Sequence, residues 1–199
     1  MRLENKNAII TGATGGIGFA TVSKYLDEGA NVMMVGRSED KLVEVYNRLG
    51  KPNNAAFSVA ESTDETAIRD SVQKTTNTFG SVDIVIANAG TEGVVQPLVD
   101  YSVQDFNYTL TVNVTGVWLY FKYAIPRMEN QGYGSIVAVA SGAGVVGFPG
   151  LCPYSASKHA VCGMVKTACL EYGEKGIRFN ALAPGPIDNR MMESLGTQS

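Results

Sequence analysis

The apolar residues of this chain gather in short continuous runs, which alternate with longer stretches where apolar and polar residues recur at helical spacing. Six of the runs are rich in β-branched residues and predict strands at residues 7–11, 31–35, 55–59, 82–87, 135–140 and 177–183. The stretches between them predict helices near residues 16–28, 39–49, 64–79, 102–129 and 154–173.

This alternation of strands and helices predicts an α/β fold. Repeated strand–helix–strand units form a doubly wound parallel sheet with helices on both faces, in three α/β/α layers. Strands that are covered on both faces are apolar along their whole length, which explains why the runs are continuous. The chain has 199 residues, 45% of them hydrophobic, and no repeat or linker, so we expect one domain over residues 1–199.

The segments that follow the six predicted strands share a composition of glycine and short polar residues. They are "TGATGGIG" (11–18), "GRS" (36–38), "AEST" (60–63), "NAG" (88–90), "SGAG" (141–144) and "PGPID" (184–188). In an open α/β sheet, ligands bind outside the carboxyl ends of the strands. Loops favour such residues in any protein, but this general preference does not account for all six segments. The sequence therefore predicts a binding crevice at this edge of the sheet.

The segment 11–18 lies between the first strand and the first helix, where glycines let the backbone approach a pyrophosphate. A plain tight turn is the alternative, but this position favours a Rossmann dinucleotide site. The second strand ends in Gly36 and Arg37, and the first acidic residue is Glu39. An acid at this strand end would bind the ribose of NAD, whereas an arginine fork suits the 2′-phosphate of NADP. The sequence thus favours NADP over NAD, with a solvated arginine as the alternative reading.

Tyr154 and Lys158 are four residues apart within a predicted helix and therefore share one face. A free phenol has a pKa near 10, and an adjacent ammonium favours the phenolate and lowers that value. Ser141, at the end of the fifth strand, is placed to hydrogen-bond a substrate oxygen that becomes negative during reduction. A tyrosine and a lysine on an ordinary helix surface are the alternative, which the nearby nucleotide turn and Ser141 make weaker.

Composition and charge exclude several other classes of function. The net charge is −3 with dispersed basic residues, so nucleic-acid binding is not expected. No run is long enough to span a membrane and the first residues are not a signal peptide, so we expect a cytoplasmic protein without membrane contact. His159 is the only histidine, which excludes a serine–histidine–aspartate triad and a histidine-rich metal site. Cys152, Cys162 and Cys169 form no CxxC motif and are expected to be buried free thiols.

Together these motifs resemble the short-chain dehydrogenase/reductase family, in the single-domain branch that includes 3-oxoacyl-ACP reductases. "TGATGGIG" fits the glycine motif of that branch and also that of the extended branch, which includes nucleotide-sugar epimerases. The "NAG" at 88–90, the serine 13 residues before the tyrosine, and "NALAPGPID" favour the single-domain branch.

The resemblance implies a role for each matching residue. Tyr154 would donate a proton to the substrate carbonyl, and Lys158 would lower the tyrosine pKa and hold the nicotinamide ribose. Ser141 would orient the carbonyl, and Asn113 would order a water in the proton relay. The cofactor pyrophosphate would contact Gly12, Thr14, Gly16, Ile17 and Gly18, and its 2′-phosphate would contact Arg37. Its adenosine would contact Glu61, Ser62, Asn88, Ala89 and Gly90. Its carboxamide would contact Pro184, Gly185 and Ile187, and Tyr154 and Lys158 would also contact the cofactor. No metal is implied.

The chain stops at Ser199, where the resemblance places the start of the substrate-covering helices. The usual last strand and lid are therefore expected to be absent from this chain. The predicted activity is NADP(H)-dependent interconversion of a ketone and a secondary alcohol. A 3-oxoacyl thioester is the first candidate substrate, followed by a small ketone, a steroid-like molecule or a sugar alcohol. The alternatives are a non-catalytic nucleotide-binding scaffold and a nucleotide-sugar epimerase or dehydratase.

A homo-oligomer, either a dimer or a tetramer, is also expected. The predicted helices that contain residues 116–125 and 160–172 are apolar around much of their circumference. This apolar surface is larger than a helix needs to pack on one face of the sheet. A thick core is the alternative explanation for this excess.

Overall fold

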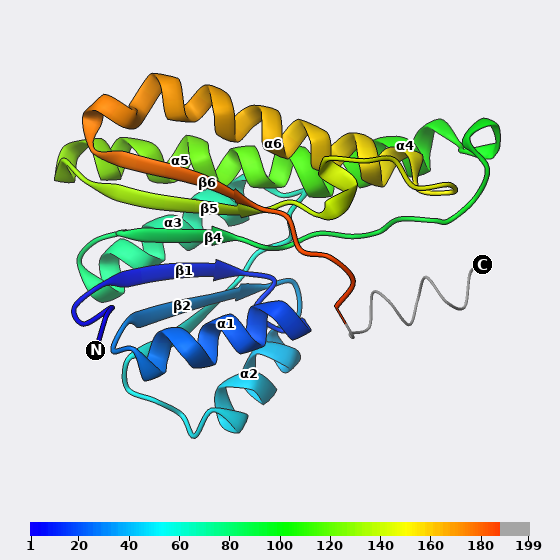
Figure 1. The fold of residues 1–199 in the computed structure, drawn as a ribbon. Helices are drawn as coiled ribbons and strands as arrows, with labels where there is room; N and C mark the ends of the chain where they lie inside the picture. The colour runs from blue at the N-terminus through cyan, green and yellow to red at the C-terminus, as the bar shows by residue number, and fades with distance from the viewer. Residues whose placement is uncertain (188–199) are drawn as a thin grey trace.

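The computed structural model describes residues 1–187 and shows a six-stranded parallel sheet between layers of helices (Figure 1). Its strand order is β3-β2-β1-β4-β5-β6. The strands are β1 Asn7–Thr11, β2 Asn31–Gly36, β3 Ala55–Val59, β4 Ile84–Ala87, β5 Gly134–Val139 and β6 Ile177–Leu182. This architecture confirms the predicted doubly wound α/β fold. Residues 188–199, where the substrate-covering helices were expected to begin, lie outside the described residues.

The helices divide between the two faces of the sheet. They are α1 Gly16–Asp27, α2 Glu39–Arg48, α3 Glu65–Phe79, α4 Val103–Leu110, α5 Gly116–Gln131 and α6 Cys152–Tyr172. The apolar sides of α1 and α2 pack on one face, and those of α3, α5 and α6 pack on the other. Two adjacent residues of β1 pack into opposite cores. Ile9 packs in the core beneath α3, α5 and α6, and Ile10 packs in the core beneath α1 and α2; both are fully buried. Burial on both faces is the reason that the strands are apolar throughout.

Local signals in the sequence start and stop several helices. The Ser38 side chain accepts a hydrogen bond from the backbone N–H of Lys41 at the start of α2, and Asp64 does the same for Ala67 before α3. Gly80 ends α3 in the left-handed conformation, with φ of 94°.

The stretch predicted as a helix over residues 102–129 is helical throughout but contains a turn of a different type. A π-helical turn at Thr111–Thr115 separates α4 from α5. Such turns insert one extra residue into the helical repeat and are frequent at functional sites. Contacts of Asn113 with distant segments accompany this turn and are described with the pocket below.

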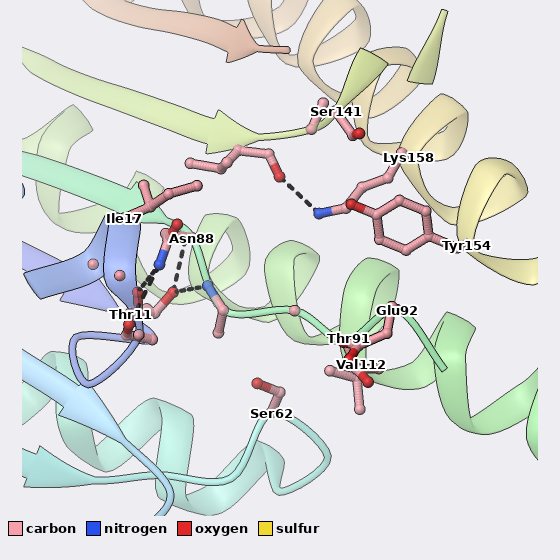
Figure 2. Close-up of a pocket in the computed structure, with 18 of the residues that line it drawn as sticks. Thr11, Ile17, Ser62, Asn88, Thr91, Glu92, Val112, Ser141, Tyr154 and Lys158 are labelled. Carbon is pink, nitrogen blue, oxygen red and sulfur yellow. Dashed lines mark hydrogen bonds between the residues drawn. The ribbon is translucent and has the colours of Figure 1, made fainter. Parts of the chain in front are cut away.

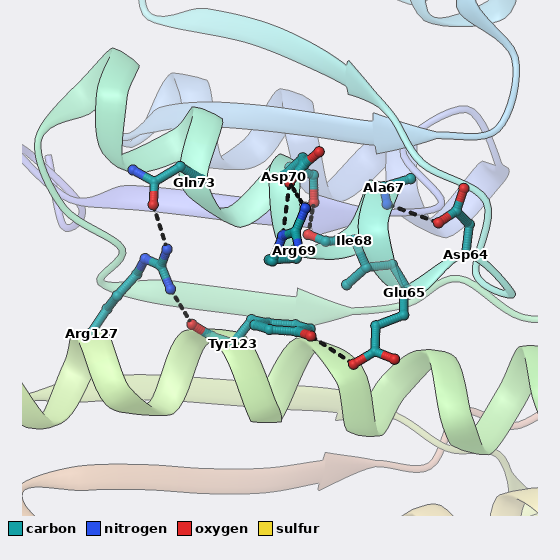
Figure 3. A network of polar contacts seen from close by, with 10 residues as sticks. Asp64, Glu65, Ala67, Ile68, Arg69, Asp70, Gln73, Tyr123 and Arg127 are labelled. Carbon is teal, nitrogen blue, oxygen red and sulfur yellow. Dashed lines mark hydrogen bonds and ion pairs between the residues drawn. The ribbon is translucent and has the colours of Figure 1, made fainter.

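A polar network holds α3 against α5 at the surface (Figure 3). The carboxylate of Glu65 accepts hydrogen bonds of 2.6 Å from both the Lys122 ammonium and the Tyr123 hydroxyl. One turn further along α5, the Arg127 guanidinium donates to the side-chain oxygen of Gln73 at 2.8 Å. These contacts fix the two helices that cover the middle of the sheet.

The cysteines differ from the expectation that all three would be buried. They are free thiols, but Cys152 and Cys162 are only partly buried and Cys169 is exposed. The Cys169 thiol donates to the backbone oxygen of Phe179 in β6 at 3.3 Å, although the residue is exposed. Within residues 1–187, no helix has both the length and the apolar content needed to cross a membrane.

Candidate active site

A pocket of about 790 Å³ opens at the carboxyl edge of the sheet, where the sequence predicted a crevice. All six segments that follow the strands contribute to its lining. Among the lining residues are every predicted cofactor-contacting position and three of the four predicted catalytic ones: Gly12, Thr14, Gly16, Ile17, Gly18, Arg37, Glu61, Ser62, Asn88, Ala89, Gly90, Ser141, Tyr154, Lys158, Pro184, Gly185 and Ile187. The fourth, Asn113, lies behind the lining.

The glycine turn after β1 is shaped by close backbone packing. Gly12 has φ of +63°, and a Cβ atom there would lie 2.9 Å from the Asn88 amide nitrogen. A Cβ atom on Gly18 would collide with the backbone oxygen of Gly12. Gly15 occupies the N-cap of α1 and has no side chain to cap the first N–H groups, and Gly15, Gly16 and Ile17 all line the pocket. An uncovered helix N-terminus of this kind fits a phosphate group.

Thr11 ties the glycine turn to the loop after β4. Its hydroxyl accepts the backbone N–H groups of Asn88 at 2.9 Å and of Ala89 at 2.8 Å (Figure 2). The Asn88 side-chain amide donates to the backbone oxygen of Thr11 at 2.9 Å. Asn88 therefore joins two loops of the predicted cofactor site, and Thr11, which the sequence reasoning missed, is its partner.

The end of the pocket near α2 is basic. Arg37 follows β2 and lines the pocket, and Lys41 in the first turn of α2 lines it as well. The sequence reasoning identified Arg37 but missed Lys41, because its position in the first turn of a predicted helix does not by itself show that it lines the pocket. On the neighbouring strand end, after β3, the Glu61 carboxylate accepts the backbone N–H of Ser62 at 3.0 Å. The glycine turn beside the open N-terminus of α1 fits the phosphates of a dinucleotide cofactor.

Tyr154 and Lys158 lie on the buried side of α6, with 9% and 4% of their surfaces exposed. The Lys158 ammonium donates to the backbone oxygen of Val139 at 2.9 Å and lies 5.6 Å from the centre of the Tyr154 ring. Burial lowers the pKa of Lys158 to about 8. The side chain of Ser141 hydrogen-bonds to that of Tyr154, so the three residues form one group.

The pKa of Tyr154 differs in direction from the sequence expectation. Burial of the phenol raises its pKa above the ordinary value and outweighs the lowering effect of the hydrogen bond with Ser141. The negative charge of Glu92 raises the pKa further. In this structure the phenol is protonated at neutral pH, which is the state that a proton donor requires.

Asn113 lies in the π-helical turn and is fully buried. Its side-chain oxygen accepts the backbone N–H of Thr91 at 2.8 Å, and its amide donates to the backbone oxygen of Thr91 and to the Ser157 hydroxyl. Ser157 in turn donates to the backbone oxygen of Tyr154 at 2.6 Å. Both amide N–H groups of Asn113 are thus used to hold protein segments, and Thr91 and Ser157 are partners that the sequence analysis missed.

Gly90 has a packing role between these groups. A Cβ atom on Gly90 would lie 3.2 Å from the Asn113 side-chain oxygen and 3.4 Å from the Lys158 ammonium. Glycine is therefore the residue that lets the loop after β4 pass this close to both side chains. Within residues 1–187, no three His, Cys, Asp or Glu side chains are grouped so that they could hold a metal ion.

Comparisons with known proteins agree with this geometry. A family model described as short chain dehydrogenase matches residues 6–199. The chain is 38% identical over 197 residues to 3-oxoacyl-(acyl-carrier-protein) reductase FabG of Thermotoga maritima, covering 98% of this chain and 79% of that protein. It is 37% identical over 189 residues to glucose 1-dehydrogenase of Gluconobacter oxydans, covering 94% of this chain and 71% of that protein.

Solved structures of similar proteins have the same fold. The structure of levodione reductase superposes with a TM-score of 0.95 at 32% identity, over 99% of this chain and 78% of that one. NAD⁺-bound xylitol dehydrogenase superposes with a TM-score of 0.89 at 34% identity, over 93% of this chain and 72% of that one.

Proposed function

Because this chain belongs to the short-chain dehydrogenase/reductase family, as its motifs predicted, we propose that it interconverts a ketone and a secondary alcohol with NADP(H). The relatives compared above are named dehydrogenases and reductases. One observation carries the proposal for this chain. Tyr154, Ser141 and Lys158 line the same pocket as the glycine turn, so a proton donor and a nucleotide-binding loop share one cavity.

A nicotinamide dinucleotide held by the glycine turn after β1 would supply the hydride for the carbonyl carbon. The Tyr154 hydroxyl gives its proton to the carbonyl oxygen, and the Ser141 hydroxyl hydrogen-bonds the same oxygen as negative charge develops there. Lys158, fixed by the Val139 carbonyl, places a positive charge beside the phenol and stabilises the phenolate that remains. Asn113 positions α6 through Ser157.

NADP is the proposed cofactor, because two basic residues line the pocket at the end of β2. Arg37 and Lys41 offer charge-assisted hydrogen bonds to a 2′-phosphate, and no acidic residue stands at that strand end. NAD is the alternative, since the similar xylitol dehydrogenase structure holds NAD⁺.

Two substrate classes are proposed. A 3-oxoacyl thioester is supported by the 38% identity to the reductase from Thermotoga maritima. A hydroxylated substrate such as a sugar or a polyol is supported by the similarity to proteins named for glucose and xylitol.

The experiment that tests the activity compares the wild type with Tyr154→Phe. We expect both proteins to bind NADPH, followed by nicotinamide fluorescence, while carbonyl reduction by the variant falls by a factor of about 10² or more because the proton donor is lost. Unchanged turnover would remove Tyr154 from the mechanism. Cofactor binding by a wild type that turns over no ketone or alcohol would favour the non-catalytic scaffold instead.

We also propose a homo-oligomer, a dimer or a tetramer, formed through α5 and α6. Trp118 on α5 is 46% exposed and Leu170 on α6 is 88% exposed, so both helices present large apolar side chains outward. Light scattering of the purified chain would check this, and a monomer at micromolar concentration would contradict it.

The cytoplasmic location stays a prediction.

A further inference from the structure

Two loops border the pocket beside the proposed reacting groups. The first, here called the β4 loop, covers residues 88–102 between β4 and α4, and the second, the β5 loop, covers residues 140–151 between β5 and α6. Figure 1 shows both at the end of the molecule where α6 begins, beyond the carboxyl ends of the strands. Both loops contribute to the pocket lining, so their spacing affects the width of the pocket at this end.

Tyr101, two residues before α4, joins the two loops through its hydroxyl group. The hydroxyl donates to the backbone oxygen of Val94 in the β4 loop at 2.6 Å and to that of Gly150 in the β5 loop at 2.7 Å. A phenol has one hydrogen to donate, so two carbonyl oxygens converge on a single donor. The chain neighbours of these two acceptors, Gly93 and Leu151, both line the pocket. The hydroxyl therefore acts on both walls from one residue behind the lining.

Other contacts between the loops lie close to this hydroxyl. The backbone N–H of Gln96 donates to the same Gly150 oxygen at the longer distance of 3.2 Å. Gly150 has φ of +74°, and a Cβ atom there would lie 3.0 Å from the Val95 side chain. The loops are therefore already packed closely at Gly150, and the Tyr101 hydroxyl makes the shorter of the two hydrogen bonds to its oxygen.

The lining beside this junction contains large apolar groups. Phe148 and Leu151 line the pocket from the β5 loop, and Tyr108 lines it from α4. A ketone whose carbonyl lies at Ser141 and Tyr154 can extend a large substituent along the β5 loop, since that loop begins beside Ser141 and ends just before Tyr154. Walls that are held at a fixed spacing bind such a substituent more tightly than walls that must first be ordered.

We infer that Tyr101 is a positioning residue that fixes the spacing of the β4 and β5 loops and so sets the affinity for ketones with a large apolar substituent. This inference rests on the proposed function and adds a residue that determines specificity from outside the pocket lining. The reacting groups have their own supports, because Lys158 is bonded to the Val139 oxygen and the backbone of Tyr154 to Ser157. Binding of the substituent and the chemical step therefore respond separately to Tyr101.

The test compares the wild type with Tyr101→Phe, which removes the hydroxyl and keeps the ring. The probes are butan-2-one and 4-phenylbutan-2-one, two methyl ketones that differ only by a phenyl group. Each is reduced with whichever of NADPH and NADH the wild type uses. Tyr133→Phe is the matched control, because the Tyr133 hydroxyl donates to the Asp83 carboxylate at 2.9 Å at the opposite, amino edge of the sheet.

We expect KM for 4-phenylbutan-2-one to rise roughly fivefold to tenfold in Tyr101→Phe, the worth of one hydrogen bond between uncharged groups. Its kcat, both constants for butan-2-one and the dissociation constant of the cofactor should stay as in the wild type. Tyr133→Phe should lose stability in urea unfolding without a change in the ratio of the two KM values. A merely structural role of Tyr101 would not separate the two ketones.

A second variant changes the junction from the other loop. Gly150→Ala places a side chain at a positive φ and against Val95, so we expect the same selective rise in KM for 4-phenylbutan-2-one. Gly50→Ala is its control, because Gly50 has φ of +79° and a Cβ atom there would meet nothing within 4 Å. This pair keeps the inference testable if Tyr101→Phe folds poorly.

Three results would overturn the inference and leave the proposed function standing. They are a KM ratio that both junction variants leave unchanged, a fall in kcat that is equal for both ketones, and a wild type that converts ethyl acetoacetate or xylitol but not 4-phenylbutan-2-one. A wild type that binds cofactor but converts none of these four compounds would overturn the proposed function together with this inference.

Discussion

Asn113 and Ser157 are joined by a 3.0 Å hydrogen bond between two segments that are 44 residues apart in the sequence. The bond links the π-helical turn after α4 to the helix that carries Tyr154 and Lys158. Because Ser157 also donates to the backbone oxygen of Tyr154, the side chain of Asn113 controls the position of the proposed proton donor without contacting its phenol. The same side chain holds Thr91, so the loop that carries Glu92 is fixed by the same residue.

Replacing Ser157 with alanine tests this link. The substitution leaves a buried N–H of Asn113 without its partner, so we expect the free energy of unfolding to fall by about 1–3 kcal/mol. We also expect kcat to fall about tenfold with the NADPH dissociation constant unchanged, because the phenol moves while the nucleotide loops stay. Urea unfolding, steady-state kinetics and fluorescence titration measure the three quantities.

Ser155 provides the matched control on the same helix. Within residues 1–187 its hydroxyl makes no hydrogen bond, so Ser155→Ala is expected to change kcat little. Equal kinetic losses in the two variants would show that any truncation in this part of α6 disturbs the site. Restoration of kcat by Ser157→Thr, which keeps a hydroxyl, would support the positioning role.

Arg37→Ala and Lys41→Ala test the cofactor preference. Each removes a basic group beside the expected 2′-phosphate, so we expect NADPH to bind roughly tenfold more weakly or worse in each variant, with NADH binding unchanged. Titration of both cofactors by nicotinamide fluorescence gives the affinity ratio. Arg48→Ala, at the other end of α2, is the control and is expected to leave both affinities unchanged. If the ratio of NADPH to NADH affinity in the Arg37 and Lys41 variants equals that of the wild type, NAD is favoured as the cofactor.

The buried ammonium of Lys158 predicts a dependence of stability on pH. Burial lowers its pKa from 10.5 to about 8, so between these values the unfolded chain binds more protons than the native chain. The free energy of unfolding therefore rises with pH through this window, and below pH 8 the native state bears the full cost of the charge, about 3 kcal/mol.

Lys158→Met removes this cost together with the hydrogen bond to Val139. We expect the variant to be more stable than the wild type at pH 7, by about 1–2 kcal/mol once the lost hydrogen bond is subtracted, and to lose turnover. This advantage should shrink toward pH 10. Urea unfolding at the two pH values measures it. Lys166→Met on the exposed side of α6 is the control, and an advantage of Lys158→Met that does not change with pH would contradict the prediction.

The sequence alone was sufficient for the order of the elements and for much of the pocket lining. Strand runs and helical periodicity are local signals, so all six strands and all five helical stretches were located without tertiary information, apart from the π-helical turn within residues 102–129. The glycine turn and the Tyr154–Lys158 spacing are also local, because a tight turn and one helix face involve only neighbouring residues.

Only the tertiary structure decided which side chains those elements bring together. The π-helical turn could not be predicted from local sequence. Its residue Asn113 contacts Thr91 and Ser157, which are 22 and 44 positions away in the sequence. The rise in the pKa of Tyr154 depends on burial and on Glu92, neither of which spacing reveals. Local sequence determines the conformation of a segment, whereas burial, electrostatic neighbours and hydrogen-bond partners exist only once distant segments have packed.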